Sequence, residues 1–288
     1  MIAIFKREMR SYFHNVIGFV FLSLLLLAAG AFCVIFNIAL GSTNFEDSLY
    51  YLQLALIVLV PLLTMRAMTE ERRTHTDQLL YSLPLPLWKI VLGKYLAMVA
   101  MLAIGCVVIA VYPLILTMFG MDNLGTAYAT LIAFFLLGAA LIAFCMFLSS
   151  LTENQLVAMI LCIVGVLVIF LLDSFVTVFA AAGAVVSFIA LIVLALLAAL
   201  GVYGLTKNVY FSSFVAILGV LPQIVIFLIN SSLYDGLLYR TVSVLSLFYR
   251  YTVFCSGIFD LTTIIYDASF AALFIFMTWL VMDKRRRA

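Results

Sequence analysis

The densest group of chemically capable side chains in this 288-residue sequence lies in the segment 66–89. Its first part is charged, its second part carries leucines at helical spacing, and prolines follow. Leucines at i, i+1 and i+4 share one helical face, and proline ends a helix because it lacks the backbone N–H. The pattern predicts a short amphipathic helix at about 68–84, which either covers the membrane surface or docks a partner protein. The residues expected to make the contact are Glu70, Glu71, Arg72, Arg73, Thr76, Asp77, Gln78, Leu79, Leu80, Leu83 and Pro84.

Residue types that catalyse reactions or bind metals are otherwise sparse and scattered. The only two histidines, His14 and His75, lie far apart in the sequence, and the five cysteines show no C-x-x-C spacing. Such cysteines usually pack as small apolar residues. The one Gly-Lys pair, Gly93-Lys94, lacks the earlier glycine and the following Ser or Thr of a phosphate-binding loop. We therefore expect no metal site, no catalytic residue and no bound cofactor on this chain, and hence no enzyme.

The composition excludes a soluble protein. Hydrophobic residues make up 67% of the chain and charged residues 10%, against roughly 45–50% and about 25% in soluble domains. The net charge of +2 gives no basis for nucleic-acid binding. The apolar runs are continuous, whereas the strands of membrane barrels alternate, and a membrane helix needs about 20 such residues.

The runs predict an all-α, polytopic membrane protein with about eight transmembrane helices. We place these spans near 16–40, 49–66, 92–118, 126–151, 155–173, 184–206, 209–230 and 264–282. The first resembles a signal peptide, but its apolar sequence continues through Phe36, which favours an uncleaved span.

The basic residues predict the orientation. With both termini in the cytoplasm, every Lys and Arg except Arg240 and Arg250 falls on the inner side of the plasma membrane, as the positive-inside rule requires. Residues 1–15 form an amphipathic interfacial helix, the elbow helix, ahead of a permease domain at 16–282 and a basic tail at 283–288. An external interfacial segment is expected at about 231–263, with a surface helix. The apolar face of the elbow helix carries Ile2, Phe5, Met9 and Phe13.

The segment 66–89 and its flanking residues resemble the corresponding stretch of ABC type-2 permeases, especially those of the gliding-motility and nitrous-oxide-reductase-maturation types. Pro61-Leu62-Leu63-Thr64-Met65-Arg66, Glu70-Glu71-Arg72-Arg73 and Val91-Leu92-Gly93-Lys94 match the family pattern, as does Gly257-Ile258-Phe259-Asp260-Leu261 near the C-terminus. His75 and Gln78 depart from it, standing where the pattern has Gly and often Glu. The matches are spread over the whole chain.

The resemblance implies the permease subunit of an ABC transporter, with export favoured. A separate ABC ATPase subunit would hold ATP and Mg and dock on the coupling helix at 68–84. A second permease copy, identical or related, would complete the transporter. Membrane lipid and an extracytoplasmic accessory protein are the further partners, and the substrate is not indicated.

Two other functions stay open. An ion-coupled secondary transporter needs ionisable residues within its spans, whereas Lys94, Asp173, Lys207 and Asp267 lie near the ends of the predicted spans. A structural membrane anchor of a larger complex would use the same docking helix. A membrane enzyme acting on lipid is disfavoured because no nucleophile–base pair is evident.

Overall fold

The computed structural model describes residues 1–70, 86–118, 120, 123–180, 183–193 and 236–287, together with 213, 217–220, 222–223, 227 and 234. Every regular element in these ranges is helical. Six of the helical segments are long and apolar enough to cross a membrane: Val16–Ala39, Phe45–Thr64, Leu87–Thr117, Leu124–Leu151, Gln155–Val176 and Leu261–Arg286. The chain is therefore a multi-span, all-helical protein of the membrane-embedded type.

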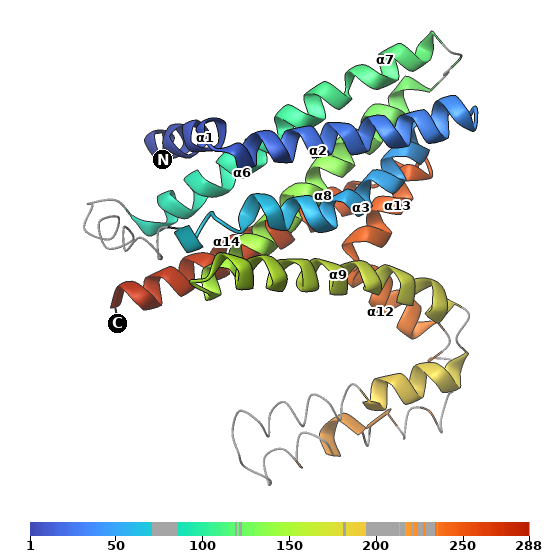
Figure 1. Ribbon diagram of the computed structural model, residues 1–288. Helices are drawn as coiled ribbons and strands as arrows, with labels where there is room; N and C mark the ends of the chain where they lie inside the picture. The colour runs from blue at the N-terminus through green and yellow to red at the C-terminus, as the bar shows by residue number, and fades with distance from the viewer. Residues whose placement is uncertain are drawn as a thin grey trace. The chain divides into compact units, whose positions relative to one another are not determined.

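The chain divides into two compact units, residues 1–168 with 250–288 and residues 169–249. Figure 1 labels the elements. They are α1 (Ile2–His14), α2 (Val16–Cys33), the π-helix η1 (Val34–Ala39), α3 (Phe45–Thr64), α6 (Leu87–Ile109), α7 (Val111–Thr117), α8 (Leu124–Leu151), α9 (Gln155–Ala180), α12 (Leu237–Leu245), α13 (Leu247–Cys255) and α14 (Leu261–Arg287).

Helix α8 forms the centre of the first unit. Its most apolar stretch is 67% buried, against 17% for α2 and α14, and it packs on α3, α6 and α14. Glycines allow close approach of α8 to α6 and of α6 to α2: a Cβ on Gly138 would lie 2.5 Å from a methyl of Leu102, and a Cβ on Gly105 would lie 2.5 Å from a methyl of Leu25. Small residues allow such close approach between membrane helices.

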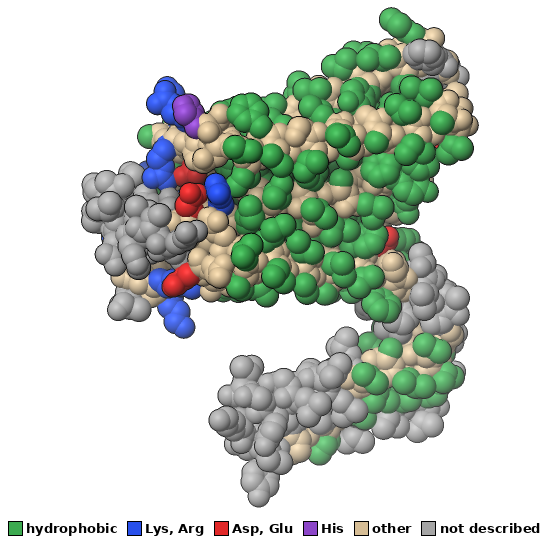
Figure 2. All heavy atoms as spheres, viewed as in Figure 1, with side chains coloured by type: hydrophobic (Ala, Val, Ile, Leu, Met, Phe, Trp, Pro, Cys, Tyr) green, Lys and Arg blue, Asp and Glu red, His purple; other side chains and the backbone are tan. Residues whose placement is uncertain are grey.

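Both termini of the first unit lie at the same end of the bundle (Figure 1). The side chain of Trp279 near the end of α14 packs against Ile4 of α1 and against Leu87 and Ile90 of α6. Figure 2 shows Lys, Arg, Asp, Glu and His side chains gathered at this end and hydrophobic side chains covering the middle of the bundle. This is the surface of a helical bundle whose middle faces lipid.

Two of the spans are interrupted for identifiable reasons. The third breaks at Ala110, between α6 and α7, because Pro113 has no N–H to donate to the carbonyl of Ile109. The first widens into the π-helix η1, which buries Asn37. The Asn37 amide donates to the carbonyls of Ser42 (2.9 Å) and Asn44 (3.0 Å), and these bonds fix the connection to α3.

The helices that match predicted spans begin earlier than the charges suggested. α3 starts at Phe45 rather than 49, so Glu46 lies inside a helix, and α6 starts at Leu87 rather than 92, so Lys94 lies further from the end of its helix than predicted. Both side chains are buried. The span expected at 184–206 is described only as the short apolar helix 184–193. The rest of it, and most of 209–230, lie outside the described residues, so the predicted count of eight stays a prediction.

The segment expected to hold one surface helix forms two helices instead. α12 ends at Leu245, Ser246 takes an extended conformation, and its hydroxyl accepts from the N–H of Tyr249 to cap α13. Tyr251 and Phe254 of α13 are buried rather than exposed. The second unit also contains an aromatic cluster in which Phe188 stacks on Phe227 at 4.2 Å.

Candidate functional sites at the two ends of the bundle

A buried lysine forms the polar centre at the end that carries the termini. Lys94 is 3% exposed, its Nζ donates to the carbonyl of Ala67 (2.6 Å), and it lies 3.8 Å from Oε1 of Glu8. Glu8 in turn accepts from Arg7 at 2.6 Å. A buried ammonium needs such partners because desolvation costs roughly several kcal/mol per ion. We call Lys94, Ala67 and Glu8 the Lys94 hub; it joins α6, the end of α3 and α1.

The chain leaving α3 stays packed as far as Thr69. Ala67, Met68 and Thr69 are buried, and the Thr69 hydroxyl donates to the carbonyl of Met65. Glu70 is exposed, and its N–H donates to the carbonyl of Arg66. The base of the predicted coupling helix is thus part of the bundle's core packing.

A narrow cavity of about 30 Å³ lies beside the hub, lined by Tyr12, Arg66 and Glu70 among others. The Arg66 Nε is buried and has no hydrogen-bond partner within the described part of the chain. The cavity has room for a water molecule that could satisfy it. Burial, followed by the charges of Glu8 and Glu70, raises the pKa of Tyr12 above its ordinary value, so this phenol stays neutral.

The structure describes only the start of the predicted docking segment. Of its residues Glu70 is described; Glu71, Arg72, Arg73, Thr76, Asp77, Gln78, Leu79, Leu80, Leu83 and Pro84 lie outside the described residues. The elbow-helix residues belong to α1, where Ile2 is 82% exposed, Phe13 is exposed and Phe5 and Met9 are half-buried. Ile4 and Tyr12, which the sequence did not single out, are the buried residues of α1.

Gly93 allows α1 to lie against α6. A Cβ on Gly93 would sit 3.0 Å from Cγ2 of Ile4, closer than ordinary contact. We expect Gly93→Leu to displace α1, because overpacking costs about 1–3 kcal/mol and raises an opened population roughly 5- to 150-fold. Trypsin cleavage after Arg7 and Arg10 should accelerate accordingly. Gly125→Leu, which meets open space, is the matched control, and equal cleavage of both variants would contradict the contact.

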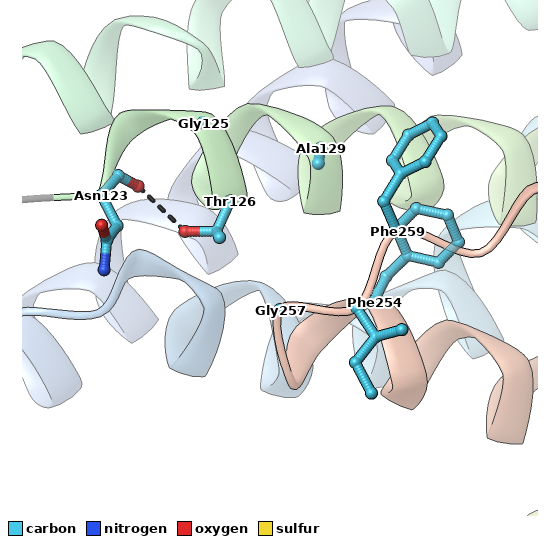
Figure 3. A pocket seen from close by; sticks show the side chains of 8 residues that line it. Asn123, Gly125, Thr126, Ala129, Phe254, Gly257 and Phe259 are labelled. Atoms are coloured by element: carbon cyan, nitrogen blue, oxygen red, sulfur yellow. Dashed lines mark hydrogen bonds between the residues drawn. The ribbon is translucent and has the colours of Figure 1, made fainter.

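The opposite end of the bundle contains two adjoining cavities, which we call the Glu46 vestibule. The larger, about 370 Å³, is lined by Ala129, Phe254 and Phe259 (Figure 3). The smaller, about 180 Å³, is lined by polar side chains that include Glu46 and Asp47. Asn123, Thr126 and Gly257 line both. The vestibule therefore has an aromatic compartment and an acidic compartment that share one wall.

Buried hydrogen bonds position the wall contributed by α13. The Tyr251 hydroxyl donates to the carbonyl of Leu49 in α3 (2.9 Å), and the Thr130 hydroxyl of α8 donates to the carbonyl of Phe254 (3.2 Å). After α13, Gly257 adopts a positive φ of 83°, which glycine tolerates without strain. These contacts hold the loop that carries Gly257 over Thr126.

Asp260 fixes the other end of that loop by capping α14. Its carboxylate accepts from the N–H of Thr262 (2.9 Å), from the Thr262 hydroxyl and from the Thr263 hydroxyl. The hydrogen bonds from Thr262 hold the pKa of Asp260 below its ordinary value. The vestibule wall is thus anchored at both ends.

Labelling of the Cys255 thiol can be used to test the charge of the vestibule. It lines the acidic compartment, and burial, with the charges of Glu46 and Asp47 adding to it, raises its pKa to about 12. In a variant with Cys255 as the sole cysteine, we expect slow labelling, with a cationic methanethiosulfonate about 10-fold faster than an anionic one, since acidic clefts concentrate cations. The preference should vanish in Glu46→Gln/Asp47→Asn. Equal rates before those substitutions would show that the carboxylates do not govern the cavity.

Comparisons with known proteins identify no family for the chain. A scan against protein-family models found no match, and searches of curated proteins and of solved structures found none either. Within the described residues, no group of three or more His, Cys, Asp or Glu side chains is arranged to hold a metal ion.

Proposed function

We propose that this chain is the permease subunit of an ABC transporter, most consistent with export, driven by a separate ATPase that docks on residues 68–84. The subunit has eight spans, with two of them in 184–230. It lies in the plasma membrane with both termini in the cytoplasm and pairs with a second permease copy. ATP and Mg are held by the partner ATPase.

The Lys94 hub carries this proposal. A docking helix transmits force only if its base moves together with the spans, and residues 67–69 are buried at that base. The charged hydrogen bond between Lys94 and Ala67 ties the base to α6; bonds of this kind contribute roughly 1.5–3 kcal/mol. A loop that merely covered the membrane surface would not require a buried lysine to hold its first residues.

The contacts of the hub would also transmit movement of a docked ATPase to the helices of the bundle. The segment 68–84 leaves α3 and returns directly into α6, while α1 packs on the first turns of α6 through Ile4 and Gly93. Two ATPase subunits closing on ATP would therefore move α1, α3 and α6 as a group. That movement is what alternating access requires of a permease.

Affinity capture tests the proposal directly. The tagged chain is purified from its native membrane in mild detergent, and mass spectrometry identifies the proteins captured with it. We expect an ABC ATPase at about one copy per permease, because each coupling helix offers one docking surface. Purification of the chain without an ATPase, from membranes in which one is expressed, would overturn the proposal.

Asp267 supports a second candidate, an ion-coupled transporter. It lies within α14, is 3% exposed, and its Oδ1 has no hydrogen-bond partner in the described part of the chain. Ionisable residues buried within spans commonly mark ion pathways. Under this candidate, liposomes containing the protein would show a proton flux down an imposed pH gradient, and Asp267→Asn would abolish it. Absence of flux in the unmodified protein removes the candidate.

A further inference from the structure

We propose that the Glu46 vestibule binds an amphipathic organic cation, an ammonium group attached to an apolar body. The ammonium would occupy the acidic compartment beside Glu46. The apolar body would lie in the aromatic compartment between Ala129, Phe254 and Phe259. The binding step needs no ATPase, so this inference goes beyond the proposed function and can fail or succeed independently of it.

The charge of the ligand follows from Glu46. This side chain is 6% exposed, lines the smaller cavity, and forms no hydrogen bond or ion pair with any described residue. Its position in the first turn of α3 gains only about 0.3–1 kcal/mol from the helix dipole. The Glu46 carboxylate lines the acidic compartment with Asp47 beside it, and the matching occupant of such a compartment is a cation.

Asp47 and the neighbouring polar groups favour an ammonium rather than a bare metal ion. The Asp47 carboxylate accepts from the Ser42 hydroxyl at 2.6 Å, so one of its oxygens is already engaged. The rest of the acidic compartment is lined by neutral acceptors, the side-chain oxygens of Asn44 and Ser256 among them. An ammonium has three N–H donors to distribute among such acceptors. A hard divalent cation takes six or more oxygen ligands and prefers carboxylates among them. The compartment, with two carboxylates of which one is already engaged, therefore suits an ammonium better.

The apolar body of the ligand follows from the larger cavity. Phe254 and Phe259 meet edge to face at 5.5 Å, and Figure 3 shows their rings near Ala129 at the side of the cavity away from Asn123. A volume of about 370 Å³ falls within the range of roughly 300–1,000 Å³ typical of small-molecule pockets. The wall shared by the two compartments places the charge and the apolar body of one molecule within reach of both.

Fluorine NMR tests the proposal with two matched probes, para-fluorophenethylammonium and its neutral isostere para-fluorophenethyl alcohol. The protein is held in nanodiscs, with empty nanodiscs as the control for partition into lipid. We expect saturable line broadening of the ammonium probe and none of the alcohol. Glu46→Gln should weaken binding about 10-fold or more, since it removes the partner of a desolvated charge. Glu153→Gln, an exposed carboxylate between α8 and α9, should leave it unchanged.

A second variant guards against a folding defect in Glu46→Gln. Ala129→Leu keeps the carboxylate but fills the aromatic compartment, and it should also weaken the ammonium probe about 10-fold by excluding its ring. Unchanged melting temperatures establish that both variants fold. Equal binding of the two probes, or full binding to both variants, overturns the proposal. So does displacement of the probe by calcium with no effect of Ala129→Leu, which would assign a metal site instead.

Lipid composition identifies the source of the cation. If phosphatidylethanolamine in the nanodisc displaces the probe and phosphatidylcholine does not, the natural ligand is a lipid amine headgroup with its chain in the apolar compartment. If neither lipid displaces it, the ligand is a free amphipathic amine. Both results support an ammonium site, and they separate its two possible occupants.

Discussion

Replacing Leu80 by aspartate is expected to abolish capture of the ATPase while leaving the permease inserted in the membrane. Leu80 belongs to the predicted apolar face of the 68–84 helix, where a partner groove would bury it. A buried carboxylate without a partner is strongly unfavourable, and loss of an interface hot spot costs about 2 kcal/mol or more, which is roughly 30-fold in affinity. The ratio of ATPase to tagged permease after affinity capture measures the effect.

Two variants of the same segment control for charge and for packing. Gln78→Glu adds a negative charge two residues away, at an expected contact position where the family pattern often has Glu, and should therefore retain the ATPase. Leu80→Met conserves the volume of the side chain, which in a packed site usually costs less than about 1.5 kcal/mol. Undiminished capture by Leu80→Asp would remove the docking assignment for this face.

Lys94→Met is expected to cause the largest loss of stability among substitutions at the hub. Methionine fills much of the same space, but the carbonyl of Ala67 loses its donor and Glu8 loses its cation at 3.8 Å. Removing a hydrogen bond to a charged group costs about 1.5–3 kcal/mol. For a protein of this size the melting temperature should fall by roughly 4–10 °C, as measured by thermal unfolding of the purified protein in detergent.

Lys89→Met is the matched control for that prediction. Lys89 lies one and a half turns earlier in α6, is half-buried, and contacts the ring of Trp88 at 5.5 Å. Changes of this kind near a surface usually stay within about 0.5 kcal/mol. Equal shifts for the two variants would mean that the ammonium of Lys94 contributes no more than a surface charge.

The hub and the vestibule can be tested separately although α3 connects them. Glu46 lies in the first turn of α3, and Ala67 follows its last turn. Leu80→Asp should leave binding of the ammonium probe intact, and Glu46→Gln should leave ATPase capture intact. If the protein binds the cation but captures no ATPase, the cation site is supported and the ABC assignment is contradicted. If it captures an ATPase but does not bind the cation, the ABC assignment is supported and the cation site is contradicted.

Hydrophobic patterning was sufficient to predict most of the helices. Continuous apolar runs in a chain with 67% hydrophobic residues leave only helices as a way to satisfy the backbone in lipid, and the span predicted at 16–40 is the helical segment Val16–Ala39. The turn after α8 was predictable as well, since polar residues interrupt the apolar sequence at 152–154. These features depend on neighbours along the chain, which a sequence displays directly.

The burial of charged residues inside helices could not be predicted from hydrophobic patterning. Glu46 was left outside the predicted span 49–66, and Lys94 was placed near the start of the predicted span 92–118, because an isolated charge is costly in lipid. Lys94 lies within its helix because Ala67 and Glu8, from two other elements, surround it. Glu46 is buried because α8 and α13 enclose it. No spacing along one segment reveals such partners.

The sequence by itself determined that the chain is a helical membrane protein, and the docking role of residues 68–84 stays a prediction. The tertiary structure decided which residues form the two candidate sites. The hydroxyl of Tyr251 reaches the carbonyl of Leu49 across 202 positions of sequence, and that bond helps turn a predicted surface helix into a buried wall of the vestibule. Periodicity reports which face of a helix is apolar, but only packing determines whether that face meets lipid, a partner or another helix.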